Sequence, residues 1–111
     1  LFRSTVGGIP AYAFLPNVAG YYQIEASVWV NGTTVGGSVF ANLRKNGGSY
    51  KQGAGGYVST NGHGGATVSC VVYLNGTTDY IELFTTQTTA ASQSLGGSNG
   101  VFMTGSLIRA A

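Results

Sequence analysis

Residues 20–30 read GYYQIEASVWV, and this stretch predicts a long β-strand. Apolar and polar side chains alternate along it, which is the period-two pattern of a strand that is buried on one face. One face would carry Tyr22, Ile24, Ala26, Val28 and Val30, and the other Tyr21, Gln23, Glu25, Ser27 and Trp29. An almost wholly apolar face needs a second layer to cover it, so the pattern predicts two packed sheets.

Further strands are predicted on both sides of this stretch, between turns rich in Gly, Asn and Pro. They span residues 1–6, 38–45, one or two short strands within 49–60, 66–74, 79–87 and 100–109. No helical periodicity extends beyond a turn or two, and the connections are too short for crossovers, so antiparallel pairing is expected. The chain of 111 residues is therefore predicted to be a single all-β domain, residues 1–111.

Two Asn-Gly-Thr-Thr segments follow predicted strands, at Asn31 and Asn75. Asn-Gly supplies the positive φ angles of a type I′ turn, so both segments predict tight hairpins. The same positions match the acceptor pattern for N-glycosylation, which is the alternative interpretation.

Composition excludes several classes of protein. Five Lys and Arg residues in the whole chain are fewer than a nucleic-acid-binding stripe requires. No apolar run approaches the roughly 18 residues of a membrane-spanning helix, and no signal peptide is recognisable. Because the chain begins at Leu1 without methionine, we expect it to be the C-terminal part of a longer protein.

The sequence offers little material for catalysis. Cys70 is the only cysteine, in an alternating run that predicts a buried and inert thiol, and His63 is the only histidine. A glycosidase needs two placed carboxylates, whereas the acidic residues are only Glu25, Asp79 and Glu82. We therefore expect no enzyme activity, no cofactor and no metal site.

Several predicted strands carry uncharged, partly aromatic side chains on the face that does not line the core. Strands that face water usually carry Lys, Glu or Arg there, so we expect another chain to cover these residues. The alternative is a weakly polar Thr and Ser surface. The expected interface residues are Phe40, Asn42, Val71, Tyr73, Phe102 and Thr104. Charge is expected only on the outer face of the other sheet, where Glu25 and Glu82 would lie on neighbouring strands.

Four segments in order resemble the globular domain of C1q. Phe14 precedes Gly20-x-Tyr22-x-Ile24 by five residues, as an aromatic residue precedes Gly-x-Tyr-x-Phe in that family. The other three are residues 43–47, residues 72–74 together with 79–83, and residues 103–108. The sequence departs from the family where Ile24, Ala26 and Met103 replace aromatics, and where Thr78 replaces a glycine.

The resemblance implies an antiparallel jelly-roll β-sandwich of the C1q and tumour-necrosis-factor type, assembled as a homotrimer. Such domains form heads on trimeric stalks. The low charge and lack of disulfides are similar to those of a phage fibre or virion surface protein, so an extracellular or virion location is expected.

The partner expected of such a head is a host cell-surface receptor, including a glycan, with neither nucleic-acid binding nor membrane insertion. Candidate ligand-binding residues in the loops mix aromatic and hydrogen-bonding groups. They are Tyr50, Lys51, Tyr57, Asn61 and His63. The alternative function is a purely structural virion or decoration module that binds no receptor.

Overall fold

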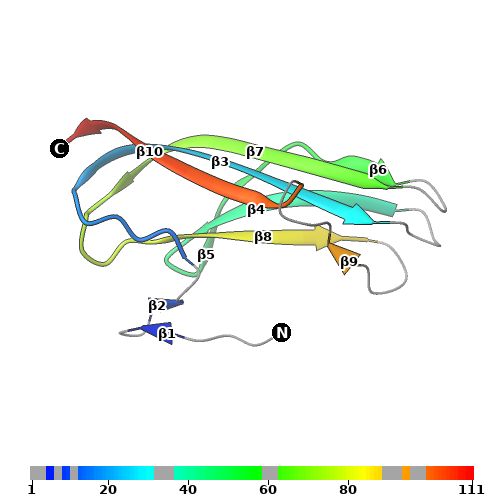
Figure 1. The fold of residues 1–111 in the computed structure, drawn as a ribbon, viewed down its shortest axis with the longest axis horizontal. Coiled ribbons are helices and arrows are strands. Elements are labelled where there is room, and N and C mark those ends of the chain that lie inside the picture. The colour runs from blue at the N-terminus through cyan, green and yellow to red at the C-terminus, as the bar shows by residue number, and fades with distance from the viewer. Residues whose placement is uncertain are drawn as a thin grey trace.

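The chain folds into β-strands arranged along the long axis of the molecule (Figure 1). The computed structural model describes residues 5–6, 9–10, 13–31, 37–58, 63–88, 94–95 and 100–111. The strands are β1 (Thr5–Val6), β2 (Ile9–Pro10), β3 (Gly20–Asn31), β4 (Gly37–Lys45), β5 (Gly48–Gln52), β6 (Gly56–Val58), β7 (Gly64–Leu74), β8 (Ile81–Gln87), β9 (Ser94–Leu95) and β10 (Phe102–Ala110). Within these ranges, no helix is long and apolar enough to cross a membrane.

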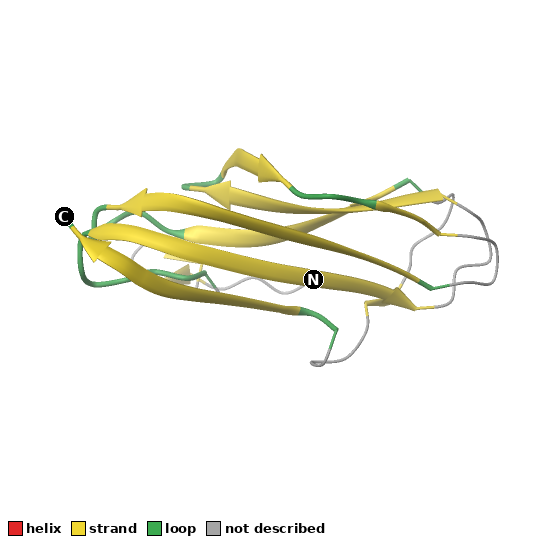
Figure 2. Ribbon diagram, turned by 90° about the horizontal axis from the view of Figure 1, so that it is seen from above, coloured by secondary structure: helices red, strands yellow, loops and turns green. Residues whose placement is uncertain are grey.

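Two antiparallel sheets form a sandwich, and each sheet is organised around one long strand. In the β3 sheet, β7 pairs along one side of β3, and β10 and β9 pair along the other. In the β4 sheet, β8 pairs along one side of β4, and β5 and β6 pair along the other. Figure 2 shows the strands running the length of the molecule. The prediction of an all-β antiparallel sandwich is confirmed.

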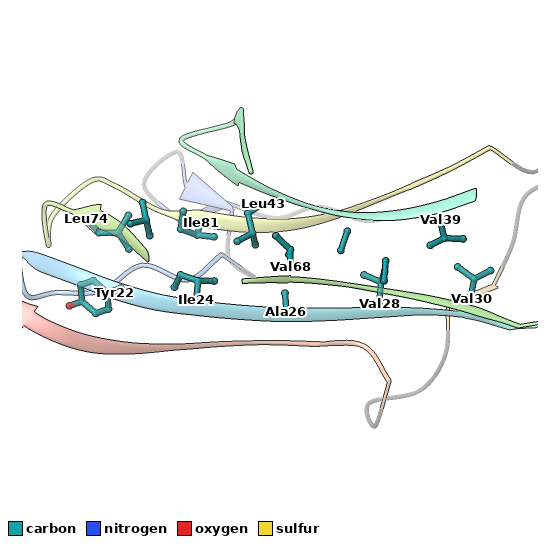
Figure 3. Close-up of a cluster of buried hydrophobic side chains, with 13 residues drawn as sticks. Tyr22, Ile24, Ala26, Val28, Val30, Val39, Leu43, Val68, Leu74 and Ile81 are labelled. Atoms are coloured by element: carbon teal, nitrogen blue, oxygen red, sulfur yellow. The ribbon is translucent and has the colours of Figure 1, made fainter. Parts of the chain in front are cut away.

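The core lies between the two sheets and follows the inward face of β3 that the sequence predicts (Figure 3). Ile24 is fully buried, and Tyr22 is only 5% exposed. The buried apolar residues are Tyr22, Ile24, Ala26, Val28, Val30, Val39, Ala41, Leu43, Ala66, Val68, Val72, Leu74 and Ile81. Leu83 was also expected in the core, but it is only partly buried against this cluster. The predicted register of β3 is therefore confirmed, since a slip by one residue would expose this whole face.

Backbone contacts connect the two sheets on both sides of the sandwich. On one side, the link between β5 and β6 crosses to β7, where Ala54 pairs with Thr67 in an isolated bridge. On the other side, Phe14 and Ile81 exchange two backbone hydrogen bonds of 2.9 and 3.0 Å. The Phe14 ring also meets the ring of Tyr22 edge-on, with 5.7 Å between centroids. Both links limit the exposure of the core between the sheets.

The Asn-Gly turns differ from their prediction. β3 and β4 lie in different sheets, and so do β7 and β8, so neither Asn31 nor Asn75 starts a tight hairpin. The turn with two positive φ angles is instead at Asn46 (54°) and Gly47 (84°), where it joins β4 to β5. The hairpin prediction at Asn31 and Asn75 is wrong because turn residues mark a change of direction but do not decide which sheet the next strand joins.

The last strand also departs from its predicted pattern. Alternation along residues 100–109 predicts that Leu107 faces the core, but Leu107 is 44% exposed. It lies on the edge strand β10, just before a register shift between Leu107 and Arg109. The shift leaves Ile108 56% exposed. A bulge of this kind breaks strict alternation, and the sequence carries no clear mark of it.

Candidate functional site

The outer face of the β3 sheet is a broad surface with few charges, and we call it the open face. It consists of Tyr21, Gln23, Glu25, Ser27, Trp29, Thr67, Ser69, Val71, Tyr73, Phe102, Thr104, Ser106 and Arg109. Its large apolar members are well exposed, from 39% at Tyr21 to 50% at Val71. The only charged residues in this set are Glu25 and Arg109, which have opposite signs.

The aromatic residues at one end of the open face contact one another. Tyr21 and Tyr73 are cross-strand partners, and their rings meet edge-on with 5.5 Å between centroids. The Arg109 guanidinium lies 5.1 Å from the centre of the Tyr21 ring. We call this group of three residues the tyrosine end. The two tyrosine rings of this group add to the exposed apolar area of the open face, and monomeric proteins usually keep such exposed apolar patches small.

The structure divides the predicted interface residues between two opposite faces. Val71, Tyr73, Phe102 and Thr104 lie on the open face. Phe40 and Asn42 point outward from β4, on the other side of the sandwich. Phe40 is half-buried there because Gly55 of the β5–β6 link packs directly on its ring. The Asn42 amide donates a hydrogen bond of 2.7 Å to the Thr86 hydroxyl.

The charges on the outer faces are not placed as the sequence suggested. Glu82 lies on β8 in the β4 sheet, opposite Arg44 of β4, so it is not on a strand next to Glu25. Its side chain is almost entirely buried, with 2% exposure. Arg44 itself lies 3.8 Å over the ring of Phe84. Among the described residues, each outer face therefore carries one acidic and one basic residue: Glu25 and Arg109 on the open face, and Glu82 and Arg44 on the face that carries Phe40.

The three acidic residues are too scattered to form a catalytic pair of carboxylates. Glu25 lies on the open face, Glu82 on the opposite sheet, and Asp79 in the connection between β7 and β8. Nor do any three His, Cys, Asp or Glu residues in the described ranges group closely enough to hold a metal ion.

Side-chain hydrogen bonds order the connection between β7 and β8. The Asn75 Oδ1 atom accepts hydrogen bonds from the backbone N–H groups of Thr77, Thr78 and Asp79, at 2.9–3.0 Å. The Asn75 Nδ2 atom donates to the Thr78 hydroxyl at 2.8 Å. These hydrogen bonds order the connection around Asn75, although the connection is not the tight hairpin that the sequence predicted. The Asn31 side chain lies outside the described residues.

Asp79 links this connection to the β4–β5 hairpin. Its carboxylate accepts hydrogen bonds from the Asn46 side-chain amide at 2.9 Å and from the Asn75 backbone at 3.1 Å. The Lys45 ammonium lies 3.8 Å from the same carboxylate and donates a hydrogen bond of 2.8 Å to the Tyr73 carbonyl oxygen. These contacts tie the two sheets together at one end of the sandwich, which assigns Asp79 a structural role.

The candidate ligand-binding residues do not form one group. Tyr50 and Lys51 lie on β5, where the Lys51 ammonium is 5.6 Å from the Tyr50 ring centre. Tyr57 is on β6, paired with Ser38 and 74% exposed on the face opposite the open face. His63 immediately precedes β7. Asn61 lies outside the described residues.

A groove that the sequence did not predict lies on the open face, at the end away from Tyr21. The groove has a volume of about 330 Å³ and is lined by Ser27, Val28, Trp29, Ala54, Gly55, Gly65, Ala66 and Thr67. Trp29 is 41% exposed, and the His63 ring stacks on it with 5.8 Å between centroids and 18° between planes. Concave sites with a few polar groups are the usual place for small ligands. The groove is therefore a candidate binding site.

Cys70 faces the core from the edge strand β7, but it is half-buried and not fully buried as predicted. Burial raises the pKa of its thiol, and the nearby positive charge of Lys51 opposes this in part. Less thiolate is then present at neutral pH, so we expect iodoacetamide to alkylate Cys70 several-fold more slowly in the folded protein than in urea. Mass spectrometry of timed samples measures both rates. Equal rates would contradict this prediction.

No protein-family model matches the chain, and no curated protein matches it either. What the structure itself defines is therefore a class: an all-β protein of two antiparallel sheets packed as a sandwich.

Proposed function

We propose that this protein is the homotrimeric head of a fibre or surface protein, located outside the cell or on a virion. In this proposal, it trimerises the protein to which it belongs and attaches it to a receptor on a host surface, without catalysing a reaction. The observation that carries the proposal is the open face, which is large, partly aromatic and nearly free of charge. A surface of this kind is typical of a protein–protein contact.

The strand order supports a jelly-roll topology of the C1q type. Strands that are neighbours in the sheets are often distant in sequence, as in β10-β3-β7, and the chain changes sheets between β3 and β4 and between β7 and β8. Such connections are typical of the Greek-key sandwiches to which jelly rolls belong. The aromatic positions of the C1q-like motif, Phe14 and Tyr22, are in ring contact. At Gly20, a β-carbon would overlap the Arg109 carbonyl oxygen, which explains the glycine of the motif.

Threefold symmetry suits the chemistry of the open face. An axis beside this face brings each residue close to its own copies, where unpaired like charges would be costly. The two charges, Glu25 and Arg109, have opposite signs and leave the face neutral. Burying a few hundred Å² of apolar surface per chain contributes several kcal/mol at about 25 cal/mol per Å², before the cost of association. Phe40 and Asn42 would lie away from this contact.

The test is to measure the oligomeric state of the chain and of a charged variant by sedimentation. The unmodified chain is expected to sediment as a species with three times the 11.3 kDa mass of one chain. Tyr73→Glu is expected to shift it to a monomer, because it places three like charges beside the axis. The matched control is Tyr57→Glu, at an exposed tyrosine on the opposite outer face, and it should leave the trimer intact.

Circular dichroism of each variant separates dissociation from unfolding. Tyr73 points away from the core, so the β-sheet signal should persist in the dissociated Tyr73→Glu protein. The proposal would be overturned if the unmodified chain were a monomer at micromolar concentration. It would also be overturned if Tyr57→Glu dissociated the trimer and Tyr73→Glu did not.

A further inference from the structure

We infer that the groove beside Trp29 binds a neutral pyranose ring, which stacks on the indole. This inference rests on the proposed attachment function and names the chemical class of its receptor as a glycan.

The groove contains an extended aromatic surface. Trp29 is the cross-strand partner of Gly65, where a β-carbon would lie only 2.9 Å from the Trp29 Cε3 atom. Because position 65 is glycine, the indole lies across β7 instead of being displaced by a side chain. The His63 ring stacks on the indole, with 18° between the planes, and covers part of it, so a sugar would pack on the part of Trp29 that stays exposed. A pyranose has one face formed mainly by C–H groups, and such a face packs on an aromatic ring through hydrophobic and dispersion contacts.

The rim of the groove offers small and neutral groups. Ala54 of the β5–β6 link pairs with Thr67 of β7 and forms a wall opposite the indole. The exposed Thr67 and the half-buried Ser27 supply hydroxyl groups at the lining. The Ser27 hydroxyl donates to the Gly100 carbonyl at 3.1 Å, so its oxygen can still accept a hydrogen bond.

The charge of the lining selects among ligand classes. None of the described residues that line the groove is charged, so a phosphate or a carboxylate would meet no opposite charge among them. A neutral ligand with hydroxyl groups around an apolar ring matches both the indole and the hydroxyl-bearing rim. The volume of about 330 Å³ is at the lower end of the range for small-molecule sites, which fits one or two sugar rings.

The groove is separated from the tyrosine end. Trp29 and Tyr21 both point outward from β3 and are eight residues apart, which corresponds to ~26 Å at ~3.3 Å per residue. The groove stays open to a ligand in a trimer whose contact is centred on the tyrosine end and leaves Trp29 outside it, which is the arrangement that this inference requires. A trimer would present three grooves, and multivalency would raise the avidity for a surface that displays many glycans.

The experiment uses Trp29 as its own reporter, since it is the only tryptophan in the chain. The full chain is titrated with the methyl glycosides of galactose, glucose, mannose and N-acetylglucosamine, and with glycerol as the control for bulk solvent effects. At least one glycoside is expected to change the tryptophan emission in a saturable manner at millimolar concentration, and glycerol is not. The absence of a saturable change with all four glycosides would overturn the inference.

Two variants test the assigned contacts by saturation-transfer NMR observed on the glycoside. Trp29→Ala is expected to weaken binding by at least roughly tenfold, because the stacking surface is lost. Thr67→Val keeps the shape but removes one hydroxyl, and we expect binding to weaken roughly 2- to 10-fold. The control, Tyr57→Ala on the opposite face, should bind as the unmodified chain does. Unchanged binding by Trp29→Ala would show that the sugar binds elsewhere and would overturn the inference.

Sedimentation of the same samples keeps this inference distinct from the assembly proposal. A trimer that binds no glycoside would overturn only the inference. A monomer that binds a glycoside at Trp29 would support the site and remove the proposed trimeric head.

Discussion

Tyr22→Ala is expected to lower the free energy of unfolding by about 3–5 kcal/mol, which is the usual loss for a buried aromatic residue. Tyr22 is 5% exposed and lies at the end of the core near Leu74 (Figure 3). Its ring meets that of Phe14, and its hydroxyl donates a hydrogen bond of 2.6 Å to the Val18 carbonyl. Truncation would leave a cavity between the sheets and remove both contacts. Since a typical protein is stable by about 5–15 kcal/mol, much of the margin would be lost.

Two matched variants divide this effect into its parts. Tyr22→Phe keeps the ring and removes only the hydrogen bond to Val18, so we expect a loss of about 0.5–1.5 kcal/mol. Tyr57→Ala, at a tyrosine that is 74% exposed on the outer face of the other sheet, should change the stability by less than about 0.5 kcal/mol. Urea unfolding followed by circular dichroism measures all three. Equal losses for Tyr57→Ala and Tyr22→Ala would contradict the burial of Tyr22.

Gly53→Ala is expected to destabilise the protein by about 1–3 kcal/mol, although it adds only one methyl group. At Gly53, the chain leaves β5 and crosses to β7, and the Gly53 N–H donates a 2.8 Å hydrogen bond to the Ala41 carbonyl of β4. A β-carbon there would overlap the Thr67 carbonyl oxygen and the Val68 side chain. These atoms belong to a paired strand, so the β5–β6 link would have to move away from β7.

The control for this substitution is Gly48→Ala on β5. A β-carbon at Gly48 has its nearest neighbour, the Lys45 carbonyl oxygen, at 3.7 Å, which is an ordinary contact. We therefore expect Gly48→Ala to leave the thermal midpoint nearly unchanged or slightly raised. If Gly53→Ala and Gly48→Ala had the same thermal midpoint, the close packing of Gly53 against β7 would be contradicted. Because Ala54 forms the groove wall, Gly53→Ala should also weaken glycoside binding, whereas Gly48→Ala should not.

The faces of the strands could be predicted from the sequence, but the partners of the strands could not. Alternation along residues 20–30 correctly assigned Tyr22 and Ile24 to the core and Tyr21 and Trp29 to the outside. Alternation describes one strand at a time, however, and does not state which strand lies beside it. Glu82 was therefore placed beside Glu25, whereas the two residues belong to different sheets.

The candidate site shows the same limit. Trp29 was predicted to point outward, but its role depends on Gly65 beside it and on Ala54 at the edge of β7. These three residues are brought together only by pairing between distant segments of the chain. The single signal available in the sequence was an outward tryptophan together with the glycines, Gly64 and Gly65, that precede the predicted strand of residues 66–74. This signal becomes informative only when the pairing register of β3 and β7 is known.

The pairing of β3 with β10 has a consequence for how the protein reaches its native state. Ser27 of β3 is aligned with Phe102 of β10, so the central strand acquires this neighbour only after a very long loop has closed. Closing such loops costs chain entropy before the contacts form, and β proteins of this kind fold on the order of milliseconds to seconds. Meanwhile, an unpaired β3 edge and its aromatic side chains remain available to other molecules. The yield of refolding should therefore fall as the protein concentration rises, and slow dilution should favour the native sandwich over aggregates.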